Sequence, residues 1–96
     1  MAAGEFVKLH AEEIRRIASH HGATNIRLFG SMARGDDRPD SDIDLLVDLK
    51  AGRHLLDLIA IKQDLEDLLG RRVDVTTERS ISPYIRDCVL KDIVQL

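Results

Sequence analysis

The spacing of hydrophobic residues changes along the chain, and each change predicts a different structural element. Apolar side chains recur at helical spacing over residues 6–21, and Gly22 suits the end of that helix. Residues 25–30 (NIRLFG) then alternate between apolar and other positions, which predicts a short strand. Residues 31–35 are expected to form one helical turn, and residues 36–40 (DDRPD) a polar loop broken by proline.

The next predicted strand alternates most clearly. One face carries Ile43, Leu45, Val47 and Leu49, and the opposite face carries Asp42, Asp44, Leu46 and Asp48. A carboxylate without a partner is costly to bury, and two neighbouring carboxylates cost more. A cation beside Asp42 and Asp44 would offset this cost, and we favour this interpretation over a turn aspartate and an edge-strand aspartate that both face water.

The second half of the chain predicts a helix, a strand and a final helix. Residues 54–69 place an apolar stripe at helical spacing, with Gly70 at its end; the stripe consists of Leu55, Leu58, Ile59, Leu65, Leu68 and Leu69. Residues 71–77 (RRVDVTT) predict a third strand with Asp74 on the face opposite its valines. A Ser-Pro pair starts a third helix over residues 82–91, and residues 92–96 fit either its end or a short strand.

This order of elements predicts one α/β (α+β) domain spanning residues 1–96. Its small mixed sheet is expected to have three to four strands, with helices packed mainly on one face. The other face would then carry Asp42, Asp44 and Asp74.

Composition narrows the classes of function. Only Phe6, Phe29 and Tyr84 are aromatic and the net charge is -3, so direct nucleic acid binding is not expected. The single cysteine, Cys88, excludes an internal disulfide and a cysteine-based zinc site, and the four histidines lack metal-ligand spacing. Because the sequence shows neither a signal peptide nor an apolar run of the ~20 residues that span a membrane, we expect a cytoplasmic protein without membrane contact.

The three aspartates are candidate metal ligands. Asp42 and Asp44 lie two positions apart on one strand face, and Asp74 lies on the corresponding face of the third strand. If these two strands are neighbours, three carboxylates converge. Carboxylate oxygens suit Mg²⁺, and three of them suffice for two ions a few ångströms apart, the arrangement used for displacement at phosphorus.

A Gly-Ser pair is the candidate phosphate-binding element. Gly30 closes the first predicted strand, and Ser31 stands where the short helical turn begins. Backbone N–H groups at such a start attract phosphate, glycine allows close approach, and the serine hydroxyl adds a donor. Arg34, one turn from Ser31, is a further candidate for contact with phosphate.

The run GSMARGDDRPDSDIDLLVD, residues 30–48, resembles the signature of the DNA polymerase beta-like nucleotidyltransferase superfamily. The Gly-Ser pair, ten further residues and then Asp-x-Asp carry this resemblance. The longer run, together with GRRVDVTT and SPYIRDCVLKDI, is similar to the minimal nucleotidyltransferases of that superfamily. The resemblance extends from about Asn25 to the end of the chain, and all three carboxylate positions match.

The resemblance implies an enzyme that transfers a nucleoside monophosphate from a triphosphate, with ATP as the expected donor, to a hydroxyl. Asp42 and Asp44 would hold two Mg²⁺ ions, and Asp74 would be a further ligand that helps to deprotonate the nucleophile. Gly30 and Ser31 would hold the triphosphate.

Minimal nucleotidyltransferases are commonly encoded beside a HEPN-domain ribonuclease toxin, so the resemblance also implies a partner. The chain would act as the antitoxin, in a possible hetero-oligomer, and add AMP to a tyrosine of the toxin. Two alternatives stay open. The first is an antitoxin that neutralises by covering the toxin through acidic patches at residues 12–13 and 64–67. The second is transfer to a small-molecule hydroxyl, against which the lack of an added acceptor domain counts.

Other residues have simpler interpretations. Tyr84 is expected to pack against the chain, with self-modification as the alternative. Cys88 is expected to be a small apolar residue on a helix face. Asp48 is expected at the surface, and the leucine stripe of residues 55–69 in the core.

Overall fold

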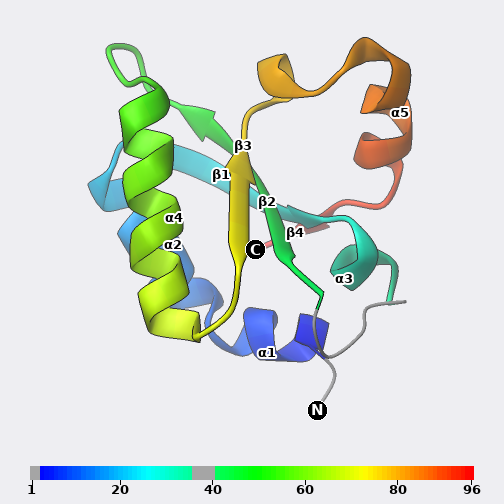
Figure 1. Cartoon of the computed structure of the whole chain (residues 1–96), viewed down its shortest axis with the longest axis horizontal. Helices are drawn as coiled ribbons and strands as arrows, with labels where there is room; N and C mark the ends of the chain where they lie inside the picture. The colour runs from blue at the N-terminus through cyan, green and yellow to red at the C-terminus, as the bar shows by residue number, and fades with distance from the viewer. Residues whose placement is uncertain (1–2, 36–40) are drawn as a thin grey trace.

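A four-stranded mixed sheet in the order β3-β2-β1-β4 forms the frame of the molecule (Figure 1). The computed structural model describes residues 3–35 and 41–96, so the predicted loop at 36–40 lies outside the described residues. The strands are β1 (Ala23–Phe29), β2 (Ile43–Leu49), β3 (Val73–Thr76) and β4 (Val94–Gln95). β2 pairs antiparallel with β1 and parallel with β3, which confirms the predicted small mixed sheet.

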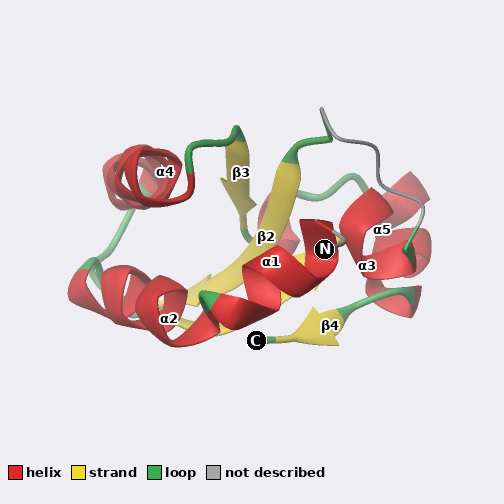
Figure 2. Ribbon diagram, turned by 90° about the horizontal axis from the view of Figure 1, so that it is seen from below, coloured by secondary structure: helices red, strands yellow, loops and turns green. Residues whose placement is uncertain are grey.

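Helices flank the sheet at two sides. They are α1 (Ala3–Leu9), α2 (Ala11–His20), α3 (Ser31–Arg34), α4 (Leu55–Leu69), the 3-10 helix η1 (Glu78–Ser80) and α5 (Pro83–Lys91). In Figures 1 and 2, α2 and α4 lie at one side of the molecule, and α3 and α5 lie at the other.

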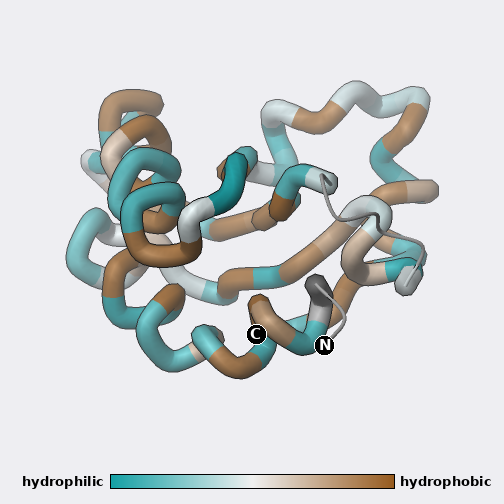
Figure 3. Tube along the Cα trace, turned by 60° about the horizontal axis from the view of Figure 1, so that its bottom comes forward, coloured by the Kyte–Doolittle hydropathy of each residue, from teal (hydrophilic) through white to brown (hydrophobic). Residues whose placement is uncertain are grey.

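The main hydrophobic core lies between α1, α2 and α4 and the apolar side of the sheet. Its buried members include Ile14 and Ala18 from α2, Ile61 and Leu65 from α4, and the strand residues Leu28, Ile43, Leu45, Val47 and Val73. Figure 3 shows the hydrophobic stretches of the strands running through the centre of the molecule. The alternation of β2 therefore sends Ile43, Leu45 and Val47 into the core and the aspartates to the other face, as predicted. Leu46 lies on the aspartate face and is buried there, outside this core.

The helix predicted over residues 6–21 is two helices. The chain turns at His10, whose Nδ1 lies 3.1 Å from the carbonyl oxygen of Phe6, and α2 starts at the next residue. This break lets both helices reach the core. Val7 of α1 and Ile14 of α2 are accordingly both completely buried. The apolar spacing was therefore correct, but it could not show the change of direction.

The leucine stripe of α4 is only partly in the core. Leu58, Ile61, Leu65 and Leu69 are buried, whereas Leu55, Ile59 and Leu68 are exposed. The helix has apolar residues on more than one side, and only one side packs against the core. The spacing of its leucines therefore predicted a wider buried face than the structure has. Gly70 ends the helix in a left-handed conformation, as expected.

The C-terminal segment differs most from the prediction. α5 has no buried residue, and Tyr84 is 95% exposed, so the expected packing of this tyrosine is wrong. Cys88 is exposed as well. Residues 92–96, which the sequence left undecided, contain β4, and β4 pairs antiparallel with β1. Within residues 3–35 and 41–96, no helix is long and apolar enough to cross a membrane.

Candidate active site

The candidate site is the polar side of β2 and β3. Asp44 and Asp74 are direct partners in the parallel register, so their side chains leave the sheet on the same face. Asp42 precedes β2 by one residue and is half-buried, as is Asp44, whereas Asp74 is exposed. The adjacency of the two strands, on which the predicted convergence depended, is therefore present.

Contacts at the start of β2 and β3 hold these aspartates in register. Arg71 donates from Nη2 to the carbonyl oxygen of Ser41 at 2.7 Å, directly before Asp42. The backbone N–H of Ile43 donates to the carbonyl oxygen of Arg72 at 2.9 Å. These bonds join the two strands just ahead of the Asp44–Asp74 pair.

A second set of contacts anchors β3 to α4. Lys62 Nζ donates to Glu66 at 2.7 Å and to the carbonyl oxygen of Val73 at 3.0 Å, and the Val73 N–H donates to Glu66 at 3.1 Å. The hydrogen bonds from Lys62 and from the Val73 backbone lower the pKa of Glu66. The residue before Asp74 is thus fixed from both its N–H and its carbonyl group.

Gly30 brings the end of β1 against Asp44. Its φ of 78° and ψ of -154° belong to a region that essentially only glycine adopts. A Cβ atom at this position would meet the carboxylate of Asp44, with Oδ2 as the nearest atom. Glycine is therefore required here by both the backbone conformation and the close approach.

Ser31 and Arg34 form the first and last residues of α3. This single turn begins directly after Gly30, as predicted, and ends at Gly35 in a left-handed conformation. Ser31 is half-buried and Arg34 is exposed. Their expected contacts with a triphosphate stay a prediction.

Asp44 is the electrostatically unusual member of the site. Burial, followed by the negative charges of Asp74 and Asp42, raises the pKa of its carboxyl group to about 6, and the positive charge of Arg34 opposes the rise. The charges of Asp42, Asp74 and Arg34 therefore all act on Asp44, although these residues lie just before β2, on β3 and on α3.

The three carboxylates are not gathered into one closed cage. Among the described residues, no three histidine, cysteine, aspartate or glutamate side chains are grouped so that they hold a metal ion as they stand. The predicted assignment of Asp42, Asp44 and Asp74 as ligands of two Mg²⁺ ions accordingly stays a prediction.

Comparison with known proteins identifies the family. The family model of the nucleotidyltransferase domain matches residues 7–96. The chain belongs to this family. The resemblance in the sequence is thereby confirmed, and the protein is a nucleotidyltransferase.

Curated relatives cover nearly the whole nucleotidyltransferase. It is 38% identical over 94 residues to the protein adenylyltransferase MntA of Thermococcus cleftensis, across 90% of this chain and 95% of that protein. It is also 40% identical over 92 residues to a candidate protein adenylyltransferase of Methanocaldococcus jannaschii, across 92% of this chain and 99% of that protein.

Solved structures agree with the fold of this nucleotidyltransferase. The structure of a candidate minimal nucleotidyltransferase matches with a TM-score of 0.84 at 44% identity, covering 97% of this chain and 95% of the other. A chain in the crystal structure of a toxin–antitoxin with AMP-PNP matches with a TM-score of 0.73 at 26% identity, covering 88% of this chain and 69% of the other.

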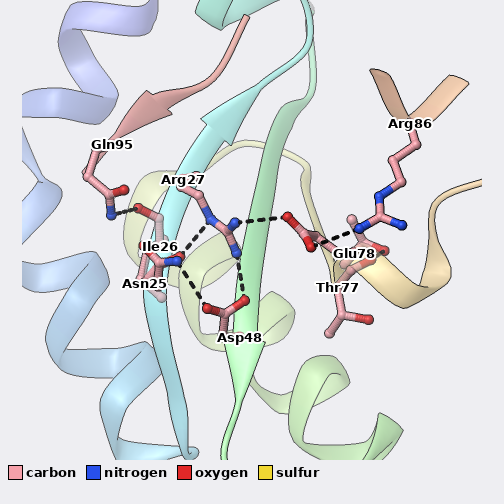
Figure 4. Close-up of polar contacts among 9 residues, drawn as sticks. Asn25, Ile26, Arg27, Asp48, Thr77, Glu78, Arg86 and Gln95 are labelled. Carbon is pink, nitrogen blue, oxygen red and sulfur yellow. Dashed lines mark hydrogen bonds and ion pairs between the residues drawn. The ribbon is translucent and has the colours of Figure 1, made fainter. Parts of the chain in front are cut away.

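A buried arginine on the polar side of the sheet was not predicted. Arg27 of β1 is 8% exposed, and its Nη2 donates to Asp48 of β2 at 2.8 Å (Figure 4). Its Nε donates to the carbonyl oxygen of Asn25 at 2.9 Å, and its Nη1 lies 3.5 Å from Glu78 of η1. Asp48 is therefore at the surface, as expected, and it also forms an ion pair with the buried Arg27.

The same network reaches the final helix of the nucleotidyltransferase. Glu78 also accepts a hydrogen bond from Arg86 of α5 at 3.3 Å, so it connects α5 to Arg27. The sequence held a usable signal, because strand alternation places Arg27 on the same face as the aspartates. The positive φ of 53° at Asn25 and the irregular β1–β2 register beside it had no such signal.

Replacing Arg27 with methionine is expected to lower the free energy of unfolding by about 1–2 kcal/mol, because the hydrogen bonds of its buried guanidinium group to Asp48, to Glu78 and to the carbonyl oxygen of Asn25 are lost. The matched control is Arg16→Met. Arg16 forms an exposed pair with Glu12, and its loss is expected to change stability by at most about 0.5 kcal/mol. Urea unfolding of both variants measures the difference, and equal losses would contradict a stabilising network at Arg27.

Proposed function

We propose that this nucleotidyltransferase is an antitoxin that transfers AMP from ATP to a tyrosine hydroxyl of a HEPN-domain toxin and thereby neutralises it. The direct pairing of Asp44 with Asp74 beside Gly30 carries the proposal, since it supplies carboxylates next to a possible phosphate-binding turn. The similarity to the protein adenylyltransferase MntA and to a chain of a toxin–antitoxin with AMP-PNP supports the choice of donor and partner.

The proposed transfer forms one bond and breaks one. The acceptor oxygen attacks the α-phosphorus of ATP, the bond from that phosphorus to the bridging oxygen of the β-phosphate breaks, and pyrophosphate leaves. The acceptor proton passes to a carboxylate, for which exposed Asp74 is the accessible candidate. Ser31 and Arg34 would contact the triphosphate from α3.

The residues present fit Mg²⁺. Asp44 and Asp74 face the same side of the sheet and offer hard oxygen donors. The negative charges of Asp74 and Asp42 contribute to the raised pKa of Asp44, which indicates negative charge that a cation would balance. Asp42, Asp44 and Asp74 would hold the ions. When bound, Mg²⁺ would neutralise charge on the phosphates and on the leaving pyrophosphate.

Incubation of the purified chain with ATP, Mg²⁺ and the toxin encoded beside it tests this proposal. Intact-mass spectrometry is expected to show AMP added to a toxin tyrosine. The double variant Asp42→Ala/Asp44→Ala is expected to add none. The control is Asp87→Ala, because Asp87 is an exposed aspartate on α5 that belongs neither to the three site carboxylates nor to the acidic patches, and it should leave the transfer unchanged. Toxin that stays unmodified with the intact protein would refute the proposed reaction.

A groove on the helical side favours the second candidate function, neutralisation by covering the toxin. Its volume is about 360 Å³, and its lining combines apolar with acidic side chains: Leu9, Glu12, Glu13, Arg16, Ile17 and Leu68. Leu9 is 66% and Leu68 38% exposed, so apolar surface is available beside the acidic residues. Such a surface complements a basic, partly apolar segment of a toxin.

Two double variants separate the two candidates. If covering is the function, toxin neutralisation survives in Asp42→Ala/Asp44→Ala and is lost in Glu12→Lys/Glu13→Lys, which reverses the charge at the groove. If transfer is the function, the opposite result is expected.

A further inference from the structure

Tyr84 is exposed to an extent that packing does not explain. It is the only tyrosine of the chain, and its side chain stands in the first turn of α5 with 95% of its surface exposed. A tyrosine ring normally contributes buried apolar surface. Here the ring adds little to the fold, and its hydroxyl has no hydrogen-bond partner among the described residues.

The position of Tyr84 is nevertheless well defined. The backbone N–H of Tyr84 donates to Oγ of Ser82 at 3.3 Å, so Ser82 caps the start of α5. Pro83 is the first residue of this helix. Two residues further along α5, Arg86 contacts Glu78, which also contacts the buried Arg27. The tyrosine therefore extends into solvent from a helix that is tied to the sheet.

Nearby hydroxyl groups are less available. Ser82 accepts the capping bond from the backbone, and the hydroxyls of Ser80 and Thr77 lie 3.2 Å apart as a hydrogen-bonded pair. Thr76 donates to the carbonyl oxygen of Thr77. A phenol also ionises more readily than an aliphatic hydroxyl, so an exposed tyrosine is the better oxygen nucleophile in this region.

We propose that Tyr84 of one copy of the protein is an acceptor of AMP in the active site of a second copy. The proposal rests on the proposed nucleotidyl transfer to protein hydroxyls. A second copy is required because a side chain that is 95% exposed contacts almost nothing of its own chain, including the three aspartates. Oη of Tyr84 bonds to the α-phosphorus of ATP, pyrophosphate leaves, and the phenolic proton passes to a carboxylate of the second copy.

Two variants that are each unable to modify themselves test the transfer between copies. Tyr84→Phe keeps the ring and an intact site but lacks the acceptor oxygen. Asp42→Ala/Asp44→Ala keeps Tyr84 but lacks the site. Each is incubated alone and both are incubated together with ATP and Mg²⁺, and peptide mass spectrometry measures AMP on the peptide that contains residue 84.

Each variant alone is expected to carry at least tenfold less AMP than the unaltered protein, and the mixture is expected to label Tyr84 of the double variant only. AMP that stays on Tyr84→Phe at another hydroxyl would overturn the assignment of the acceptor. Labelled toxin together with unlabelled Tyr84 would overturn this inference and leave the proposed function intact. Absence of AMP from both toxin and Tyr84 would refute the proposed function and, with it, this inference.

Discussion

Asp44→Asn is expected to abolish nucleotidyl transfer and, in the absence of divalent cations, to make the protein more stable at neutral pH. The asparagine keeps the shape of the side chain but removes the negative charge that would hold Mg²⁺ beside the triphosphate. Loss of several kcal/mol of transition-state stabilisation corresponds to a fall in kcat/KM of roughly a thousandfold. The gain in stability has a separate cause, which lies in the ligand-free protein.

The stability change follows from the raised pKa of Asp44. Its carboxyl group has a pKa of about 6 in the folded protein, against an ordinary value of 3.8, because of burial and of the charges of Asp74 and Asp42. Between these two values the folded state binds more protons than the unfolded state, so this group lowers stability as the pH rises from about 4 to about 6. The penalty is complete above about pH 6 and absent below about pH 4.

The asparagine variant does not have this penalty. The full shift of about two pKa units corresponds to roughly 3 kcal/mol. Because Asp44 is only half-buried, solvent screening reduces the expected gain to on the order of 1–2 kcal/mol at pH 7.5. At pH 4 the gain is expected to be small.

Urea unfolding at pH 4 and pH 7.5 with a chelator measures this difference, and Asp67→Asn on α4 is the control. A variant that is less stable at pH 7.5, or one that gains equally at both pH values, would contradict the electrostatic explanation. Addition of Mg²⁺ is expected to raise the stability of the unaltered protein at pH 7.5 and to leave Asp44→Asn almost unchanged.

The parts of this site that the sequence predicted are those that depend on local alternation. Asp42, Asp44 and Asp74 could be placed on one face because side chains in a strand alternate with a period of two, whatever the rest of the fold does. Their proximity also required β2 and β3 to be neighbours, which the order of elements made a natural expectation.

The parts that were missed depend on contacts between distant segments. Arg27 is 51 positions from Glu78 in the sequence. No local pattern predicts that η1 brings Glu78 close to this arginine of β1. The turn at His10 is a second example, since the apolar spacing continues through it. The exposure of α5 is a third: its sequence has the amphipathic pattern of a packed helix, but none of its residues is buried.

Gly30→Ala is expected to damage both the fold and the activity, whereas Gly35→Ala damages the fold only slightly. The two glycines bracket α3 and have nearly the same φ, 78° and 80°. They differ in their surroundings. An added Cβ at Gly30 would meet the carboxylate of Asp44, but the same atom at Gly35 would have no atom of residues 3–35 and 41–96 within 4 Å.

Comparing Gly30→Ala with Gly35→Ala separates the effect of the contact with Asp44 from the effect of backbone strain. Alanine at Gly35 costs only the left-handed conformation, about 1 kcal/mol. Alanine at Gly30 has a less favourable conformation, which costs up to about 3 kcal/mol, and it must also displace Asp44. The free energy of unfolding should therefore fall by at least about 2 kcal/mol in Gly30→Ala, and kcat/KM should fall a hundredfold or more because a misplaced carboxylate no longer faces Asp74.

Urea unfolding and toxin labelling with ATP, measured on both variants, decide whether this reasoning holds. Gly35→Ala should keep transfer within a factor of about three, because the added Cβ would displace no described side chain of the site. If the two variants lost equal activity, the conformation of α3 rather than the approach of Gly30 to Asp44 would control the site. If Gly30→Ala kept full activity, the carboxylate of Asp44 would not need its present position, and its assignment as a metal ligand would fail.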